Sequence, residues 1–155
     1  MSDKDVLLRF LFEQAPVRGE VVHLDASWIA LLERQDYPGP VRDLLGQMMA
    51  AGALLAATIK FGGTLTLQIQ GDGPVNLAVV EVSAERTLRG LAHWQGELDD
   101  PDLRTLIGNG RLAITIDPGE GGKRYQGIVP LERPTLAEAL DDYLERSEQL
   151  ATRLW

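Results

Sequence analysis

The chain contains no cysteine and only two histidines among its 155 residues. Without cysteine it can form no disulfide, no thiolate metal site and no cysteine nucleophile. The histidines, His23 and His93, are too far apart in the sequence to form a helix-spaced pair of metal ligands. His93 falls on the polar side of its predicted strand, where a solvated surface residue is expected. We therefore expect no catalytic residue, no cofactor site and no metal site in this chain.

Long apolar runs are also lacking. The longest, Met48 to Ile59, has 12 residues, whereas a membrane span needs about 20. The N-terminal stretch Met1 to Asp5 is polar, and Arg9 and Glu13 interrupt the apolar residues that follow, which is unlike a secretory signal. The sequence thus predicts a soluble cytoplasmic protein without a membrane partner.

Positive charge is scarce, because 15 Lys and Arg residues stand against 23 Asp and Glu residues, giving a net charge of -8 at pH 7. A polyanion such as DNA would be repelled, since its binding depends on Lys and Arg neutralising phosphates. We therefore expect no nucleic-acid partner. The hydrophobic fraction of 45% is ordinary for a globular protein, and the length fits a single domain over residues 1–155.

The centre of the chain predicts a long helix from Val41 to Lys60. In its first half, apolar residues recur on one stripe from Val41 to Met49. Its second half, Ala50 to Ile59, has almost no polar face, and a helix that is apolar all round is expected to be buried all round. The preceding Tyr37-Pro38-Gly39-Pro40 is expected to stop any helix. The long helix is predicted to be the spine of the core.

Hydrophobic alternation predicts strands on both sides of this helix. The expected strands are Val6 to Phe12, Val17 to Leu24, Thr64 to Gln70, Val75 to Val82, Arg86 to Trp94, Leu112 to Ile116 and Tyr125 to Val129. The first two are predicted to form a hairpin, and the first is expected to be substantially buried because both of its faces are apolar. The next three are predicted to form an antiparallel meander in which Val75, Leu77 and Val79 share one face.

Shorter helices are expected at three places. Asp25 is a favourable N-cap for a helix from Ala26 to Arg34, and Pro101 to Ile107 forms a second short helix. Thr135 and Glu138 form a capping box that starts the last helix, which has an apolar inner stripe and an acidic outer face. Together the elements predict an α+β fold, with antiparallel β-sheet structure packed around a long buried apolar helix and an amphipathic C-terminal helix.

Three patterns resemble functional motifs, but each lacks a residue, a spacing or a structural setting that its motif requires. Gly108 to Ala113 matches the sequence pattern of a dinucleotide-binding loop, but such a loop opens a helix, whereas a strand is expected here. Gly122-Lys123 matches the end of a phosphate-binding loop, but Arg124 stands where Ser or Thr is needed. The acidic residues of the stretch Glu97 to Asp102 lack the spacing of a calcium-binding EF-hand, so we interpret them as a solvated loop.

One long segment carries a resemblance to a known family. Residues 44–75 read Leu-Leu-Gly-Gln-Met-Met-Ala-Ala-Gly-Ala-Leu-Leu-Ala-Ala-Thr-Ile-Lys-Phe-Gly-Gly-Thr-Leu-Thr-Leu-Gln-Ile-Gln-Gly-Asp-Gly-Pro-Val. With Arg89-Gly90, Arg124 to Leu131, Leu136 to Tyr143 and Ser147-Glu148-Gln149, this segment resembles the bacterial redox-regulated holdase chaperones, the thirty-three-kilodalton heat-shock protein family. The resemblance spans nearly the whole chain and matches the family's N-terminal core domain.

The resemblance implies a function that the residues alone do not reveal. Members of this family bind unfolding client proteins without ATP, prevent their aggregation under heat and oxidative stress, and are activated by oxidation. Four cysteines in a C-terminal domain hold zinc when reduced, and oxidised members dimerise. This chain has no cysteine, so the zinc and redox domain is expected to be absent from it. The implied partners are unfolded client proteins, and a homodimer is left open.

The sequence does not assign the client-binding surface to particular residues. We hypothesise that it lies on the sheet, near the strands around Leu65 to Val79, since exposed apolar patches mark binding sites. The alternative is that these residues face the buried helix, because each strand normally gives one apolar face to the core. Two other functions remain open: a passive oligomerisation or protein-binding module without chaperone activity, and a small enzyme of unknown chemistry.

Overall fold

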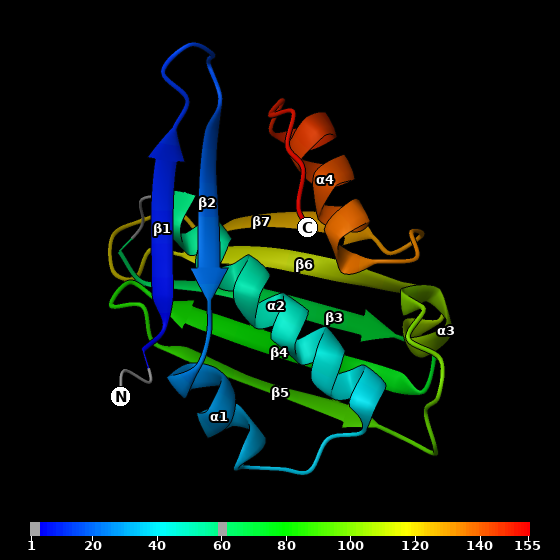
Figure 1. Ribbon diagram of the computed structural model, residues 1–155. Helices are drawn as coiled ribbons and strands as arrows, with labels where there is room; N and C mark the ends of the chain where they lie inside the picture. Colours follow the sequence, from blue (N-terminus) through cyan, green and yellow to red (C-terminus); the bar gives the residue numbers. More distant parts are fainter. Residues whose placement is uncertain (1–3, 59–61) are drawn as a thin grey trace.

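The computed structural model describes residues 4–58 and 62–155, which form a five-stranded sheet, a two-stranded hairpin and several helices (Figure 1). The predicted α+β class with antiparallel sheets is confirmed. The strands are β1 (Val6–Leu11), β2 (Arg18–His23), β3 (Thr64–Gly71), β4 (Val75–Ser83), β5 (Leu88–Trp94), β6 (Gly110–Asp117) and β7 (Tyr125–Pro130). The helices are α1 (Ala26–Leu32), α2 (Gly39–Thr58), α3 (Leu103–Ile107) and α4 (Leu136–Ser147).

The five-stranded sheet has the order β5-β4-β3-β6-β7, and every neighbouring pair is antiparallel. The predicted meander of β3, β4 and β5 is confirmed. Gly71, at the end of β3, lets the connection from α3 to β6 approach closely, because a Cβ there would lie 2.2 Å from the carbonyl oxygen of Ile107. The Asp72 carboxylate then accepts hydrogen bonds from the backbone N–H of Asn109 at 2.7 Å and from its side-chain amide at 3.1 Å.

Helix α2 lies across one face of this sheet (Figure 1). The β3 side chains of Leu65, Leu67 and Ile69 are all 0% exposed beneath it. Nine α2 residues are buried: Val41, Leu44, Leu45, Met48, Met49, Ala51, Gly52, Leu55 and Ala57. Ala53 and Leu54 keep part of their surface, so the expectation that the second half is buried all round is wrong.

Helix α2 begins earlier than expected. The preceding helix α1 ends at Leu32, before the stretch from Tyr37 to Pro40, and α2 starts at Gly39 rather than at the predicted Val41. Proline is tolerated in a first helical turn, where its missing N–H would have no partner within the helix. Ile59 and Lys60, which the sequence placed in this helix, lie outside the described residues.

Strand β4 contains an irregularity that changes which residues face the core. Its pairing with β5 shifts register between Val75 and Leu77. A bulge adds one residue to a strand and so reverses the alternation beyond it. Ala78 and Val80 therefore join Val75 in the core, whereas Leu77 and Val79 face away from it. The prediction that Val75, Leu77 and Val79 share one face is wrong for this reason.

The hairpin of β1 and β2 is confirmed, with a register that pairs Val6 with His23 and Leu11 with Arg18. The prediction that β1 is substantially buried is wrong. Val6, Leu8 and Phe10 are 42%, 61% and 45% exposed, because no second layer covers that side of the two-stranded ribbon. In Figure 1 the hairpin crosses the C-terminal end of α2, and its turn projects past the sheet.

The helix caps match the sequence in one case and differ in another. The Thr135 hydroxyl accepts a hydrogen bond from the Glu138 N–H at 3.2 Å, as the predicted capping box requires. Asp25 occupies the N-cap position of α1, but its side chain makes no capping hydrogen bond. The carboxylate of Asp5, distant in sequence, accepts from the N–H of Ser27 instead.

Helix α4 packs against β7 and the sheet core through Leu136, Ala139, Leu140 and Tyr143, all of which are buried. Leu144 is partly buried against the core, but the helix ends at Ser147, and Leu150, which the sequence placed on the inner stripe, is 46% exposed. No helix in residues 4–58 and 62–155 is long and apolar enough to cross a bilayer.

Candidate functional site

The residues tested for enzyme or metal chemistry do not come together. His23 on β2 and His93 on β5 are both exposed and lie on different sheets. In the acidic loop, Asp102 accepts a hydrogen bond from the Arg104 N–H at 2.9 Å and caps α3. The described part of the chain contains no group of three or more His, Asp or Glu side chains that could hold a metal ion.

The two rejected glycine motifs lie in connections between elements. Gly108 ends α3, and residues 110–117 then form strand β6 rather than a helix. Gly122-Lys123 lies in the loop of the β6–β7 hairpin, whose register pairs Ile116 with Tyr125. Neither motif therefore has the strand-to-helix setting that binds a nucleotide phosphate.

The most distinctive surface of the described residues is one side of the β1–β2 hairpin, which we name the outer hairpin face. The register places Leu8 opposite Val21, and the Phe12 N–H continues the ladder by donating to the Val17 carbonyl at 3.0 Å. Side chains two apart on a strand share a face. The outer hairpin face consists of Val6, Leu8, Phe10, Phe12, Val17 and Val21, which are 42–61% exposed.

Two aromatic contacts order this face although no core lies beneath it. A Cβ at Gly19 would lie 2.1 Å from the Phe10 ring, so the ring packs directly over the glycine backbone on the neighbouring strand. Phe10 and Phe12 also meet edge to face, with ring centroids 5.8 Å apart and planes at 82°. Such edge-to-face pairs are favourable beyond the area that they bury.

The opposite side of the ribbon, the inner hairpin face, is mixed in character. It carries Leu7, Arg9 and Leu11 from β1 and Arg18, Glu20 and Val22 from β2. Arg9 and Glu20 form an ion pair at 3.1 Å. The hydroxyl of Thr58, at the end of α2, donates to the other Glu20 oxygen at 2.9 Å. These contacts fasten the hairpin to the body while its outer face stays open.

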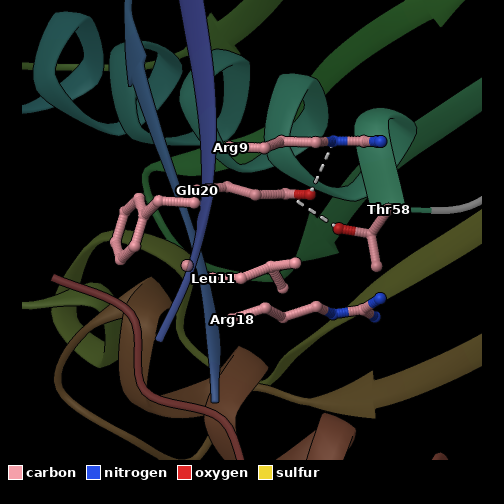
Figure 2. Close-up of a pocket in the computed structure, with 7 residues that line it drawn as sticks. Arg9, Leu11, Arg18, Glu20 and Thr58 are labelled. Atoms are coloured by element: carbon pink, nitrogen blue, oxygen red, sulfur yellow. Dashed lines mark hydrogen bonds and ion pairs between the residues drawn. The ribbon is translucent and has the colours of Figure 1, made fainter. Parts of the chain in front are cut away.

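A hollow of about 420 Å³ lies between the inner hairpin face and the end of α2. Figure 2 shows Arg9, Leu11, Arg18 and Glu20 pointing from the hairpin toward the side where Thr58 lies. The hollow therefore combines an apolar side chain, two guanidinium groups, a carboxylate and a hydroxyl.

Asp5 holds the base of the hairpin to α1. Its carboxylate accepts hydrogen bonds from the Asp25 N–H at 2.8 Å, the Ser27 N–H at 3.2 Å and the Ser27 hydroxyl. Partial burial opposes ionisation of this carboxyl, but the bonds from Ser27 and Asp25 outweigh it and lower the pKa of Asp5 below its ordinary value.

A second polar cluster ties α4 to β7. The hydroxyls of Tyr125 and Tyr143 lie 2.5 Å from each other and 2.8 and 3.1 Å from one Glu148 carboxylate oxygen, so two hydroxyl protons are shared among three contacts. Burial, together with the bonds to Tyr125 and Glu148, raises the pKa of Tyr143. Glu148 is exposed, as expected for the acidic face of the last helix, and it also accepts hydrogen bonds from this cluster.

For β3, the alternative to the hypothesis about the strands around Leu65 to Val79 is confirmed. Leu65, Leu67 and Ile69 face α2, as the alternative held. The open face of the sheet, opposite α2, carries only a sparse apolar row that includes Leu91 and Ile128, which are 43% and 51% exposed. Polar groups flank this row, among them the Arg89–Glu81 ion pair at 2.6 Å.

Sequence reasoning missed the outer hairpin face. The available signal was the strand Val6 to Phe12 with apolar residues on both faces. Such a strand fits burial between two layers and also fits a ribbon with one uncovered side. The sequence does not say whether a covering layer exists.

The described residues thus form an α+β domain with a contiguous exposed apolar surface on its hairpin, and surfaces of this kind generally mark binding sites. The family model described as "Hsp33 protein" matches residues 5–155. The chain is 53% identical over 156 residues to the 33 kDa chaperonin of Enterobacter sp. (strain 638) and 55% identical over 155 residues to that of Nitrosococcus oceani. The chain belongs to the Hsp33 protein family, which confirms the resemblance seen in the sequence.

These alignments cover 100% of this chain but only 53% of each relative, so the chain spans about half the length of the curated relatives that it matches. The fold agrees with the crystal structure of a 33 kDa chaperonin from Thermotoga maritima. That comparison has a TM-score of 0.76 at 23% identity, and it covers 92% of this chain and 51% of the other.

Proposed function

We propose that this chain is the client-binding core of an ATP-independent holdase chaperone, acting in the cytoplasm as one domain over residues 1–155. Its membership of a family whose relatives are named chaperonins supports a chaperone role. The single observation that carries the proposal is the outer hairpin face, whose six apolar side chains are 42–61% exposed.

The physical basis is the hydrophobic effect. An unfolded client exposes apolar side chains, and burial of apolar surface is worth about 25 cal/mol per Å² without any nucleotide. Aromatic residues dominate such contacts because each buries a large area. Phe10 and Phe12 would therefore be the strongest contributors on the outer hairpin face. The net charge of -8 favours solubility of the chaperone while it holds an aggregation-prone client.

We further propose that redox control and zinc binding, which the family resemblance implies, reside outside these 155 residues. A thiolate zinc site and a disulfide switch both need cysteine, and this chain has none. The chain by itself would then hold clients equally well under reducing and oxidising conditions.

The test is aggregation of a heated client protein, followed by light scattering with and without the purified chain. The double variant Leu8→Ser/Phe10→Ser should lose most of the suppression seen with the unchanged chain. The matched control is Leu91→Ser/Ile128→Ser, which removes two comparably exposed apolar side chains from the open sheet face. It should retain suppression, and circular dichroism should show that both variants are folded. Equal loss in both variants, or no loss in either, would contradict the proposal.

The same apolar face also supports the alternative of a passive oligomerisation module. A second copy of the chain could cover the outer hairpin face symmetrically. Mass measurement in solution separates the two functions. The oligomerisation module is favoured if the unchanged chain is a dimer that does not suppress aggregation, and if Leu8→Ser/Phe10→Ser is a monomer.

A further inference from the structure

We propose that the hollow under the hairpin is a subsite for a carboxylate that neighbours an apolar side chain in a client segment. The inference rests on the proposed holdase function and adds a charge preference to it. Its occupant would be an extended stretch of unfolded protein in which Asp or Glu stands beside a residue such as Leu, Val or Phe.

The first support is the excess of positive over negative charge in the hollow. Arg9 is paired with Glu20 at 3.1 Å, and Glu20 is further satisfied by the Thr58 hydroxyl at 2.9 Å. Arg18 forms no ion pair with any residue in 4–58 or 62–155. One guanidinium charge is therefore left over in the hollow, although the chain as a whole carries -8.

The second support is the direction and neighbourhood of Arg18. In Figure 2 its side chain extends on the same side of the hairpin as Thr58, and it lines the hollow. Its partner across the ladder is Leu11, which is 78% exposed and lines the same hollow. A guanidinium binds a carboxylate with two parallel hydrogen bonds, and Leu11 offers apolar contact beside it. The pair is thus complementary to an acidic residue that adjoins an apolar one.

The third support is the size of the hollow. A volume of about 420 Å³ lies within the range of roughly 300–1,000 Å³ that is usual for ligand pockets. One acidic side chain of an extended client segment, with its apolar neighbour against Leu11, fits in this volume.

The test uses two fluorescent peptides that are identical except for one position. Both carry apolar residues, and that position is Asp in one and Asn in the other. Binding to the whole chain is followed by fluorescence anisotropy at low and high salt. The Asp peptide should bind about threefold to fivefold more tightly at low salt, as a partly exposed ion pair allows, and the difference should shrink at high salt.

Variants at Arg18 assign the preference. Arg18→Gln should abolish the difference between the peptides, and Arg18→Lys should retain part of it because the charge remains without the fork geometry. The matched control Arg111→Gln removes an exposed arginine on β6, away from the hairpin, and should leave the difference unchanged.

The outcomes separate the subsite from the holdase function. Equal binding of both peptides to the unchanged chain, or a preference that survives Arg18→Gln, would overturn the subsite. If the peptides bind equally and Leu8→Ser/Phe10→Ser abolishes binding of both, the holdase proposal stands without the subsite. If neither peptide binds the unchanged chain, both proposals fail.

Discussion

The five-stranded sheet and the β1–β2 hairpin are both antiparallel and rich in aliphatic residues, but they use these residues differently. In β3, Leu65, Leu67 and Ile69 are 0% exposed beneath α2, whereas in β1 Leu8 and Phe10 are 61% and 45% exposed. Strand composition therefore does not decide the role of an apolar residue. The presence of a second layer decides it, because burial requires something to be buried against.

The largest expected effect is on the free energy of unfolding, when the same substitution, Leu to Ala, is made in the sheet and in the hairpin. Leu67→Ala leaves a cavity in the closed core under α2 and should lower the free energy of unfolding by about 2–5 kcal/mol. Leu8→Ala removes the same atoms from an exposed position and should change it by about 0.5 kcal/mol or less. Urea unfolding of the two variants measures both values. Similar losses at the two positions would mean that the outer hairpin face is covered in solution.

A smaller contrast is expected between two tightly packed glycines. A Cβ at Gly71 would meet the backbone oxygen of Ile107, which cannot move without shifting α3. Gly71→Ala should therefore cost about 1–3 kcal/mol, as overpacking does. At Gly19 the obstacle is the Phe10 ring, which is partly exposed and can rotate away, so Gly19→Ala should cost about 0.5 kcal/mol or less.

Thermal unfolding compares the two glycine variants. A large loss in Gly19→Ala, equal to that of Gly71→Ala, would show that the Phe10 ring is held as rigidly as the core. That result would make the hairpin part of the folding core rather than an attached ribbon.

The smallest effect is a pH dependence confined to the base of the hairpin. The folded-state pKa of Asp5 is lowered, so its contribution to stability is complete above the ordinary value of about 3.9 and is lost as pH falls through the lower folded value. Acidification should therefore loosen the hairpin while the sheet stays intact. Amide NMR spectra recorded from neutral pH downward would show β1 and β2 signals changing before those of β3.

Asp5→Asn provides the control for this pH dependence. The variant should show weakened hairpin protection already at neutral pH and no further hairpin-specific change on acidification. If the β1 and β3 signals in the unchanged chain disappear together on acidification, Asp5 does not stabilise the hairpin independently of the sheet.

Much of the fold could be predicted from the sequence because local patterns specify it. The alternation of Leu65, Leu67 and Ile69 predicted β3, and the Thr135–Glu138 pair predicted the start of α4; both are confirmed. These signals depend on neighbours within a few residues. The elements were accordingly right in type, with ends that differ by a few residues.

The remaining features depend on contacts between distant residues. The carboxylate of Asp5 caps α1, and a bulge reverses which β4 side chains face the core. The exposure of β1 arises because no second layer covers that side of the hairpin. The candidate site belongs to this second group. Arg18 and Thr58 lie on different elements that only the folded chain brings together, so the hollow had no signature in the sequence.

The packing of Phe10 over Gly19 has a thermodynamic consequence. A flexible surface side chain loses rotamer entropy when a partner immobilises it, at a cost of about 0.5–1.5 kcal/mol. Contacts with the glycine backbone and with the edge of Phe12 favour one position of the Phe10 ring before any partner arrives, without fixing the ring there. The ribbon is thus preorganised, and a greater share of the apolar contact energy remains available for association.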